Sequence, residues 1–126
     1  MNLNSYQREA QKTDRVPGRK NAQAGVDLVV PLLGLAGETG ELLSEYKKHL
    51  RDGNAHLLFK DRVAEELGDL LWYIANVAAK FDLKLENIAQ GNLKKTKDRW
   101  GNQDTALIVF DAEYKEGERF PRQFEV

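Results

Sequence analysis

Four acidic residues in the middle of the chain have a spacing that suits metal binding. Glu38 and Glu41 lie three residues apart, and Glu66 and Asp69 repeat that spacing farther along. Residues three apart share one face of a helix, so each pair would present two carboxylates on the same side. Two carboxylates about 4 Å apart repel by roughly 4 kcal/mol at an effective dielectric constant near 20. Mg²⁺ or Mn²⁺ would offset this repulsion, because both prefer oxygen ligands.

The ordinary alternative for these four acids is a solvated helix face. It is disfavoured because both pairs flank apolar residues on two successive helical segments. Other metals are disfavoured by the available donors. The chain has no cysteine, and His49 and His56, which we expect at the surface near a turn, cannot form a zinc site without carboxylate help.

Further polar residues follow the acids at helical spacing. Tyr73 and Asn76 continue the face of the second acidic pair beside an apolar seam, which favours a wet cleft over a plain solvent face. Lys95 and Arg99 lie on one line of the next helical segment. A metal facing such cations suggests a phosphorylated ligand, and the alternative for this charged run is a solvated face.

Four helices are expected to position these side chains. The periodicity places them at about 2–13, from 27 to a turn at 51–54, from 58 or 61 to 81, and at 85–100. The link before the last helix is short, so the third and fourth helices should be antiparallel neighbours. The expected buried stripes are Leu32, Leu35, Leu42, Tyr46 and Leu50 on the second helix and Val63, Leu67, Leu70, Ile74, Val77 and Phe81 on the third.

Glycines at positions 34, 37 and 40 lie inside the second expected helix. Each costs about 1 kcal/mol relative to alanine in a helix interior. We therefore expect another helix or a ligand to approach closely there. The alternative is that Gly34 or Gly37 breaks the helix.

The N-terminal twenty residues carry an excess of positive charge. Five basic residues stand against two acidic ones, and two interpretations remain open: a solvated arm, or a mobile lid over a polyanionic substrate. The basic residues are Arg8, Lys12, Arg15, Arg19 and Lys20.

Length and composition predict one domain, residues 1–126, with a helical core at about 2–100 and a C-terminal extension at about 101–126. The 41% apolar and 31% charged residues suit a soluble globular protein, and a net charge of −1 gives no electrostatic footprint for nucleic acid. No segment resembles a signal peptide or a membrane span, so we expect a cytoplasmic protein without membrane partners. The apolar stripes exceed what one small bundle can cover, which predicts a homodimer or homotetramer.

The segments Gly34-Leu-Ala-Gly-Glu-Thr-Gly-Glu-Leu42 and Glu65-Glu-Leu-Gly-Asp-Leu-Leu-Trp-Tyr73 resemble the MazG-type all-α nucleoside triphosphate pyrophosphohydrolases. The resemblance extends from about residue 6 to 100. It implies an all-α, four-helix bundle with a C-terminal extension. It also implies Mg²⁺ held by Glu38, Glu41, Glu66 and Asp69, phosphate contacts from Lys95 and Arg99, Tyr73 beside the nucleoside, and Asn76 on the same cleft wall.

The reaction implied by the resemblance is hydrolysis of a nucleoside triphosphate to the monophosphate and pyrophosphate, for nucleotide pool sanitation or control. Glu38 and Glu45 are both candidates to accept the proton of the attacking water. Two alternative functions remain: a non-catalytic helical interaction module with a structural cation site, and a hydrolase of another nucleotide such as phosphoribosyl-ATP or an alarmone.

Overall fold

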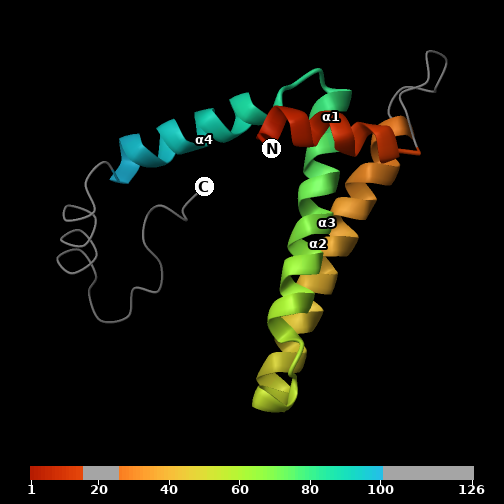
Figure 1. Cartoon of the computed structure of the whole chain (residues 1–126), viewed down its shortest axis with the longest axis vertical. Coiled ribbons are helices and arrows are strands. Elements are labelled where there is room, and N and C mark those ends of the chain that lie inside the picture. The colour runs from red at the N-terminus through yellow and green to blue at the C-terminus, as the bar shows by residue number, and fades with distance from the viewer. Residues whose placement is uncertain (16–25, 101–126) are drawn as a thin grey trace. The chain divides into compact units, whose positions relative to one another are not determined.

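The computed structural model describes residues 1–15 and 26–100 of the chain (Figure 1). It contains α1 (Leu3–Thr13), α2 (Val26–Asp52), the 3₁₀ turn η1 (Gly53–Ala55), α3 (Phe59–Lys80) and α4 (Leu85–Trp100). No strand occurs within these ranges, so the all-α prediction is confirmed, and each helix lies within a few residues of its expected bounds. The predicted C-terminal extension lies outside the described residues.

Internal contacts divide the chain into two compact units, Met1–Glu86 and Asn87–Val126. Each unit is described by itself, and α4 belongs to the second for most of its length. The antiparallel packing expected for the last two helices therefore stays a prediction, as does the single domain.

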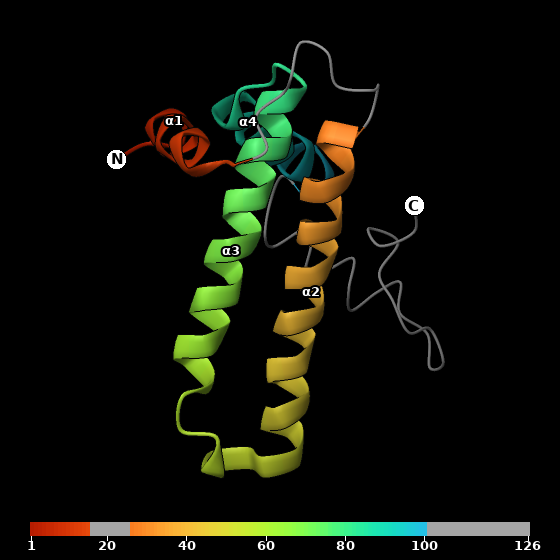
Figure 2. The same cartoon turned by 90° about the vertical axis from the view of Figure 1, so that its right-hand side faces the viewer.

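In the first unit, α2 and α3 run antiparallel, side by side, and are joined by η1 (Figure 2). Gly53 begins this turn with φ of +57°, a left-handed conformation that glycine adopts without a steric penalty. Because the helices are antiparallel, residues early in α2 lie opposite residues late in α3. The hairpin thereby brings the two acidic pairs of the sequence to the same level.

A polar cluster closes the η1 end of the hairpin. Glu45 is buried and accepts a hydrogen bond from Lys48 Nζ (2.7 Å), and its other oxygen lies 2.8 Å from His56 Nε2. The His49 ring stacks on Phe59 with the ring centroids 4.1 Å apart. The His56 side chain is only 17% exposed, so the expectation of two surface histidines is wrong: both rings pack against the α2–α3 connection.

Helix α1 begins with a capping box. Ser5 N donates to Asn2 Oδ1 (2.8 Å) and Asn2 N donates to Ser5 Oγ (2.9 Å), which satisfies two backbone donors of the first turn. The helix lies across α3 at the end away from η1 and packs on it (Figures 1 and 2). The small core formed there consists of Ala10, Ala75 and Leu85, with Leu3, Tyr6 and Trp72 packed around it.

One buried side chain connects α1 to the end of α3. Gln7 Nε2 donates to the carbonyl oxygens of Ala75 (3.2 Å) and Leu83 (2.9 Å), and its Oε1 accepts from Leu85 N (2.9 Å). Three hydrogen bonds from one amide fix α1 against both α3 and the connection into α4. The N-terminal helix is therefore held by a specific polar contact in addition to its small apolar core.

Much of the apolar surface of α2 and α3 is exposed within the part of the chain that the structure describes. A two-helix hairpin covers one side of each helix, and α1 covers α3 only at one end. The prediction of buried stripes is therefore wrong for several residues, although Leu35, Leu42, Val63, Leu70 and Val77 are half-buried. The exposed members are Leu32, Tyr46, Leu50, Leu67, Ile74 and Phe81. No described helix is both long and apolar enough to cross a membrane.

Candidate functional site

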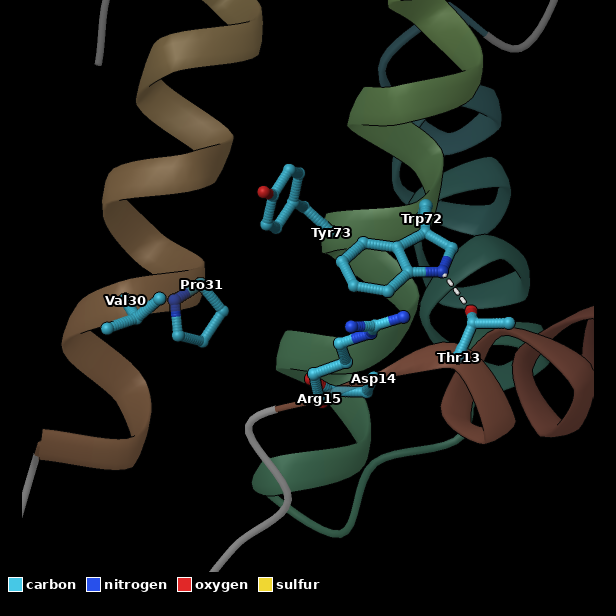
Figure 3. Close-up of a pocket in the computed structure, with 7 residues that line it drawn as sticks. All are labelled: Thr13, Asp14, Arg15, Val30, Pro31, Trp72 and Tyr73. Carbon is cyan, nitrogen blue, oxygen red and sulfur yellow. Dashed lines mark hydrogen bonds between the residues drawn. The ribbon is translucent and has the colours of Figure 1, made fainter.

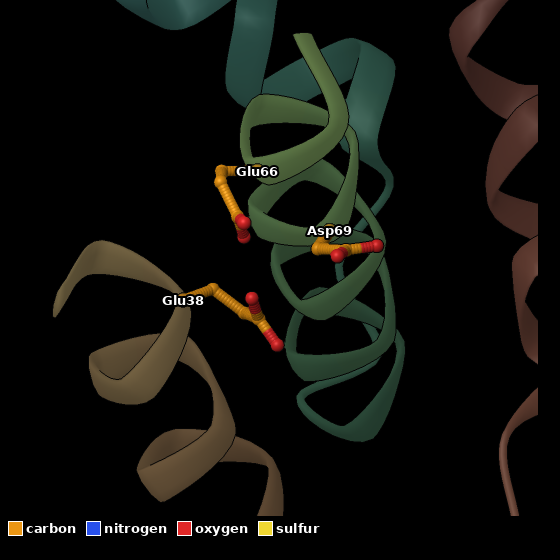
Figure 4. A group of neighbouring side chains, drawn as sticks. All are labelled: Glu38, Glu66 and Asp69. Carbon is orange, nitrogen blue, oxygen red and sulfur yellow. The ribbon is translucent and has the colours of Figure 1, made fainter. Parts of the chain in front are cut away.

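Three of the four predicted acids converge between α2 and α3. Carboxylate oxygens of Glu38, Glu66 and Asp69 all lie within 4.8 Å of one another (Figure 4). Glu38 extends from α2 toward the two acids of α3. The Glu38 and Glu66 side chains are partly buried, and Asp69 is exposed. Glu41 is exposed and is not part of this group of three, which we call the acidic cluster.

The acidic cluster carries an electrostatic cost. Burial raises the pKa of Glu66 above its ordinary value of 4.5, and a hydrogen bond with Glu38 raises it further. The negative charges of Glu38, Asp69 and Glu41 act in the same direction. Glu41 is thus close enough to influence the acidic cluster although its carboxylate does not converge with the others.

The acidic cluster fits a hard divalent cation. All of its donors are carboxylate oxygens, the ligand type that Mg²⁺ and Mn²⁺ prefer. The three residues that would hold the cation come from both helices of the hairpin, and each offers one carboxylate oxygen within 4.8 Å of the other two. A cation held by Glu38, Glu66 and Asp69 would also remove the repulsion that raises the pKa of Glu66.

The structure separates the two candidates for proton acceptor. The hydrogen bonds from Lys48 and then His56 lower the pKa of Glu45, and both carboxylate oxygens are engaged in these contacts. A carboxylate stabilised in its charged form is a weak base. Glu38, which belongs to the acidic cluster, is therefore the stronger candidate of the two.

Tyr73 lies one turn after Asp69 and packs against α2 at Gly34. A Cβ atom added to Gly34 would overlap the Tyr73 ring and lie 2.7 Å from its hydroxyl oxygen. The expectation of a close approach is confirmed at Gly34, and α2 continues unbroken through all three glycines. Gly37 and Gly40 face open space, so their expected close approaches are absent from the described structure.

A pocket of about 270 Å³ opens beside Tyr73 (Figure 3). Val30 and Pro31 of α2 face Trp72 and Tyr73 of α3 across it, and the two aromatic rings meet edge to face at 5.0 Å. The end of α1 forms the remaining side. The residues that line the pocket are Thr13, Asp14, Arg15, Val30, Pro31, Trp72 and Tyr73.

Two polar contacts hold the end of α1 at this pocket. Trp72 Nε1 donates to Thr13 Oγ1 (2.8 Å), and Lys80 Nζ donates to Asp14 Oδ2 (2.7 Å). The Lys80 and Asp14 side chains are only 7% and 12% exposed. Breaking a largely buried ion pair is costly, so this contact fixes the chain direction where α1 ends.

Tyr6 of α1 is influenced by one residue of the acidic cluster. Burial raises the pKa of Tyr6, and the negative charge of Asp69 raises it further. Tyr6 and the pocket residues from α1 and early α2 were not singled out as site residues from the sequence. Among these residues, only Arg15 was noted from the sequence, as part of the basic N-terminal segment.

The remaining predicted site residues have different positions. Asn76 is buried, with 1% of its surface exposed, and its Nδ2 donates to the carbonyl oxygen of Trp72 (3.0 Å). It lies one turn beyond Trp72 but does not line the pocket. Lys95 and Arg99 are exposed on α4 in the second unit, so their position relative to the acidic cluster stays a prediction.

Gly34→Ala tests the contact between Tyr73 and α2. The added methyl group must displace the Tyr73 ring, whereas the gain in helix propensity is about 1 kcal/mol. We expect little change in melting temperature but a KM for substrate that is higher by roughly tenfold, because Tyr73 lines the pocket one turn after Asp69 of the acidic cluster. Gly40→Ala, whose new methyl group would meet open space, is the matched control and should keep the parent KM. Equal KM values for both variants would contradict a role for the Tyr73 position.

Comparisons with known proteins identify the family of this chain. The family model of the MazG nucleotide pyrophosphohydrolase domain matches residues 31–102, which include α3, α4 and most of α2. The chain is 35% identical over 101 residues to the Gene 37 protein of Mycobacterium phage L5, covering 79% of this chain and 89% of that protein. No solved structure matches the chain. The family match and this relative establish that the chain belongs to the MazG family of nucleotide pyrophosphohydrolases.

Proposed function

We propose that this protein is a Mg²⁺-dependent pyrophosphohydrolase that converts a nucleoside triphosphate to the monophosphate and pyrophosphate, with Mn²⁺ as a possible substitute. The observation that carries the proposal is the convergence of Glu38, Glu66 and Asp69 beside an aromatic pocket. The acidic cluster suits a metal–triphosphate complex, and the pocket suits a nucleoside. We assign the activity to nucleotide pool sanitation or control in the cytoplasm.

Each part of the site has a distinct task in this proposal. Glu38, Glu66 and Asp69 hold the cation, and Glu41, one turn after Glu38, completes the ligand set. A divalent cation held there would neutralise triphosphate charge and activate water for attack. Glu38 offers one oxygen to the cation and accepts the proton of the attacking water on its other oxygen, because Glu45 is engaged with Lys48 and His56 through both of its oxygens.

The nucleoside occupies the pocket in this arrangement. Pro31 lies about 10 Å before Glu38 along α2, at a rise of 1.5 Å per residue. Trp72 and Tyr73 follow Asp69 on α3 toward the same end of the hairpin. A nucleotide with its phosphates at the acidic cluster therefore has its sugar beside Tyr73 and its base between the pocket walls.

Lys95 and Arg99 are proposed to contact the phosphates, with Asn76 supporting the same wall of the site. Arg99→Ala and Lys95→Ala should each lower kcat/KM by roughly a hundredfold, because cationic contacts strengthen as charge moves to the leaving pyrophosphate. Arg99→Lys should also be costly, since lysine lacks the forked geometry of the guanidinium group. Lys97→Ala, on the same helix but off their line, is the control. Parent-like kinetics of Lys95→Ala and Arg99→Ala would show that both are solvated surface residues.

The deciding experiment is pyrophosphate release from a panel of nucleotides with Mg²⁺ and with EDTA. Release from nucleoside triphosphates that needs the divalent cation would support the proposal. If only phosphoribosyl-ATP or an alarmone is hydrolysed, the protein is a hydrolase of that nucleotide and not of nucleoside triphosphates in general. No turnover of any nucleotide, together with binding of Mg²⁺, would favour the non-catalytic interaction module.

We further propose that the chain forms a homodimer or homotetramer. Large apolar side chains are exposed along both helices of the hairpin, with Leu50 at 67% and Leu67 at 51%. Soluble monomers rarely expose extended apolar patches of this kind. Light scattering at micromolar concentration should give at least twice the mass of 14.3 kDa. A mass equal to that of one chain would contradict this proposal.

A further inference from the structure

The pocket has apolar and aromatic walls and a polar side that belongs to α1. Val30 and Pro31 face Trp72 and Tyr73 across a space of about 270 Å³, and the two aromatic rings offer apolar contact to a base (Figure 3). The α1 side contains three residues, Thr13, Asp14 and Arg15, which lie outside the region matched by the family model. The family match therefore assigns no role to this side of the pocket.

The polar groups of two of these residues already hold the fold together. Thr13 Oγ1 accepts from Trp72 Nε1 (2.8 Å) and donates to the carbonyl oxygen of Ala10 (2.9 Å). Asp14 Oδ2 accepts from Lys80 Nζ in a largely buried ion pair. These contacts hold α1 against α3 and fix the orientation of the pocket side.

Arg15 is in a different situation. Its side chain is exposed at the pocket, and within residues 1–15 and 26–100 it forms no ion pair. A guanidinium group offers several N–H donors in a planar fork and no acceptor. Arg15 therefore offers hydrogen-bond donors to a ring in the pocket, whereas the neighbouring Asp14 carboxylate is engaged with Lys80.

The direction of a bound nucleotide determines which edge of the base meets Arg15. The acidic cluster lies two turns along α2 from Pro31, so the phosphates and sugar lie on that side of the pocket. Arg15 lies on the α1 side, away from the acidic cluster. The edge nearest to it is the one opposite the glycosidic bond, which carries position 4 of a pyrimidine or position 6 of a purine.

We propose that Arg15 makes this site selective for bases with a keto group at that edge, namely uracil, thymine, guanine or hypoxanthine. This inference rests on the proposed function of the same site. A keto oxygen accepts from the guanidinium fork, as O6 and N7 of guanine do in arginine–guanine pairs. Cytosine and adenine instead present an amino group, whose N–H donors would face the N–H donors of Arg15.

The experiment compares two pairs of substrates that differ mainly in this group. The kcat/KM values of dUTP against dCTP, and of dITP against dATP, are measured with the full chain and Mg²⁺. We expect the keto member of each pair to be preferred by about tenfold or more. Dissociation constants for the same four nucleotides, measured by calorimetry, provide the same ratios without turnover.

Three variants locate the source of the preference. Arg15→Ala should bring both ratios close to one, and Arg15→Lys should lower them because the fork is lost while the charge remains. Arg8→Ala removes an exposed arginine of α1 that does not line the pocket and should keep the parent ratios. If Arg15→Ala weakens all four nucleotides equally, Arg15 contacts phosphate or stabilises the fold, and the inference is wrong.

The outcomes separate this inference from the proposed function. Equal use of keto and amino bases, or a preference for the amino member, would overturn the inference while turnover itself supports the pyrophosphohydrolase. Binding without turnover would end the proposed enzyme activity, and the binding ratios would still decide the role of Arg15. A protein that binds none of the four nucleotides would overturn both.

Discussion

Replacing Glu66 with glutamine is expected to lower nucleotide hydrolysis strongly and, in the absence of divalent cations, to raise the melting temperature. Glu66 is partly buried and shares a hydrogen bond with Glu38, and its neighbours Glu38, Asp69 and Glu41 are acidic. Glutamine keeps the shape and can donate to the Glu38 carboxylate without adding a negative charge. Loss of a metal ligand should lower kcat/KM by about a hundredfold or more.

The stability effect should depend on pH in a defined direction. The folded protein holds the proton of Glu66 more tightly than the unfolded chain, because its pKa is raised above 4.5. Stability of the parent without metal therefore falls as pH rises from about 4.5 through the raised folded pKa, and the lower value persists above it. The glutamine variant does not lose stability in this way, because its side chain does not titrate. The difference in melting temperature should consequently be absent below pH 4.5 and largest near neutral pH.

Mg²⁺ should reverse the order of the two proteins at neutral pH. Only the parent has the complete acidic cluster, so only the parent gains the full free energy of cation binding on folding. Glu65→Gln is the matched control, since Glu65 is a neighbouring exposed glutamate whose partner is Arg62. Thermal melts of all three proteins with EDTA and with Mg²⁺ test the prediction. If Mg²⁺ does not change the melting temperature of the parent, even with nucleotide present, the proposed metal site is wrong.

The sequence predicted the parts of this protein that depend on local pattern. The helical periodicity placed α3 and α4 within a few residues of their ends, because capping, turn residues and apolar spacing act over short distances. The meeting of Glu38 with Glu66 and Asp69 followed from the repeated spacing on two antiparallel helices. Gly34 was recognised as a point of close approach because a glycine inside a helix is otherwise unfavourable.

Features that depend on contacts between distant segments were not predictable from one sequence. Thr13 and Trp72 are 59 residues apart, and no local pattern shows that their side chains form a hydrogen bond. The same holds for Lys80 and Asp14, which are 66 residues apart. The polar side of the pocket depends on both contacts. It could not be predicted from the sequence, in which the N-terminal segment is distinguished only by its positive charge. The contact between His56 and Glu45 likewise forms only through the hairpin turn.

Gln7→Leu is expected to destabilise the protein strongly and to damage the pocket from a distance. The substitution removes hydrogen bonds to the carbonyl oxygens of Ala75 and Leu83 and to the N–H of Leu85, while leucine keeps a similar volume. Buried groups that lose their partners cost about 3 kcal/mol in total, which corresponds to a fall in melting temperature on the order of 10 °C for a domain of this size.

The same substitution should change substrate binding more than the chemical step. Gln7 anchors the helix that brings Arg15 to the pocket, whereas the acidic cluster is built by α2 and α3. Below its melting temperature the variant should therefore show a KM raised about tenfold with kcat largely retained. Gln11→Leu changes an exposed glutamine of the same helix and should stay within about 0.5 kcal/mol of the parent. If Gln7→Leu melts and binds nucleotide like Gln11→Leu, the buried amide does not hold α1 in place, and the polar side of the pocket must be fixed by the contacts of Thr13 and Asp14 alone.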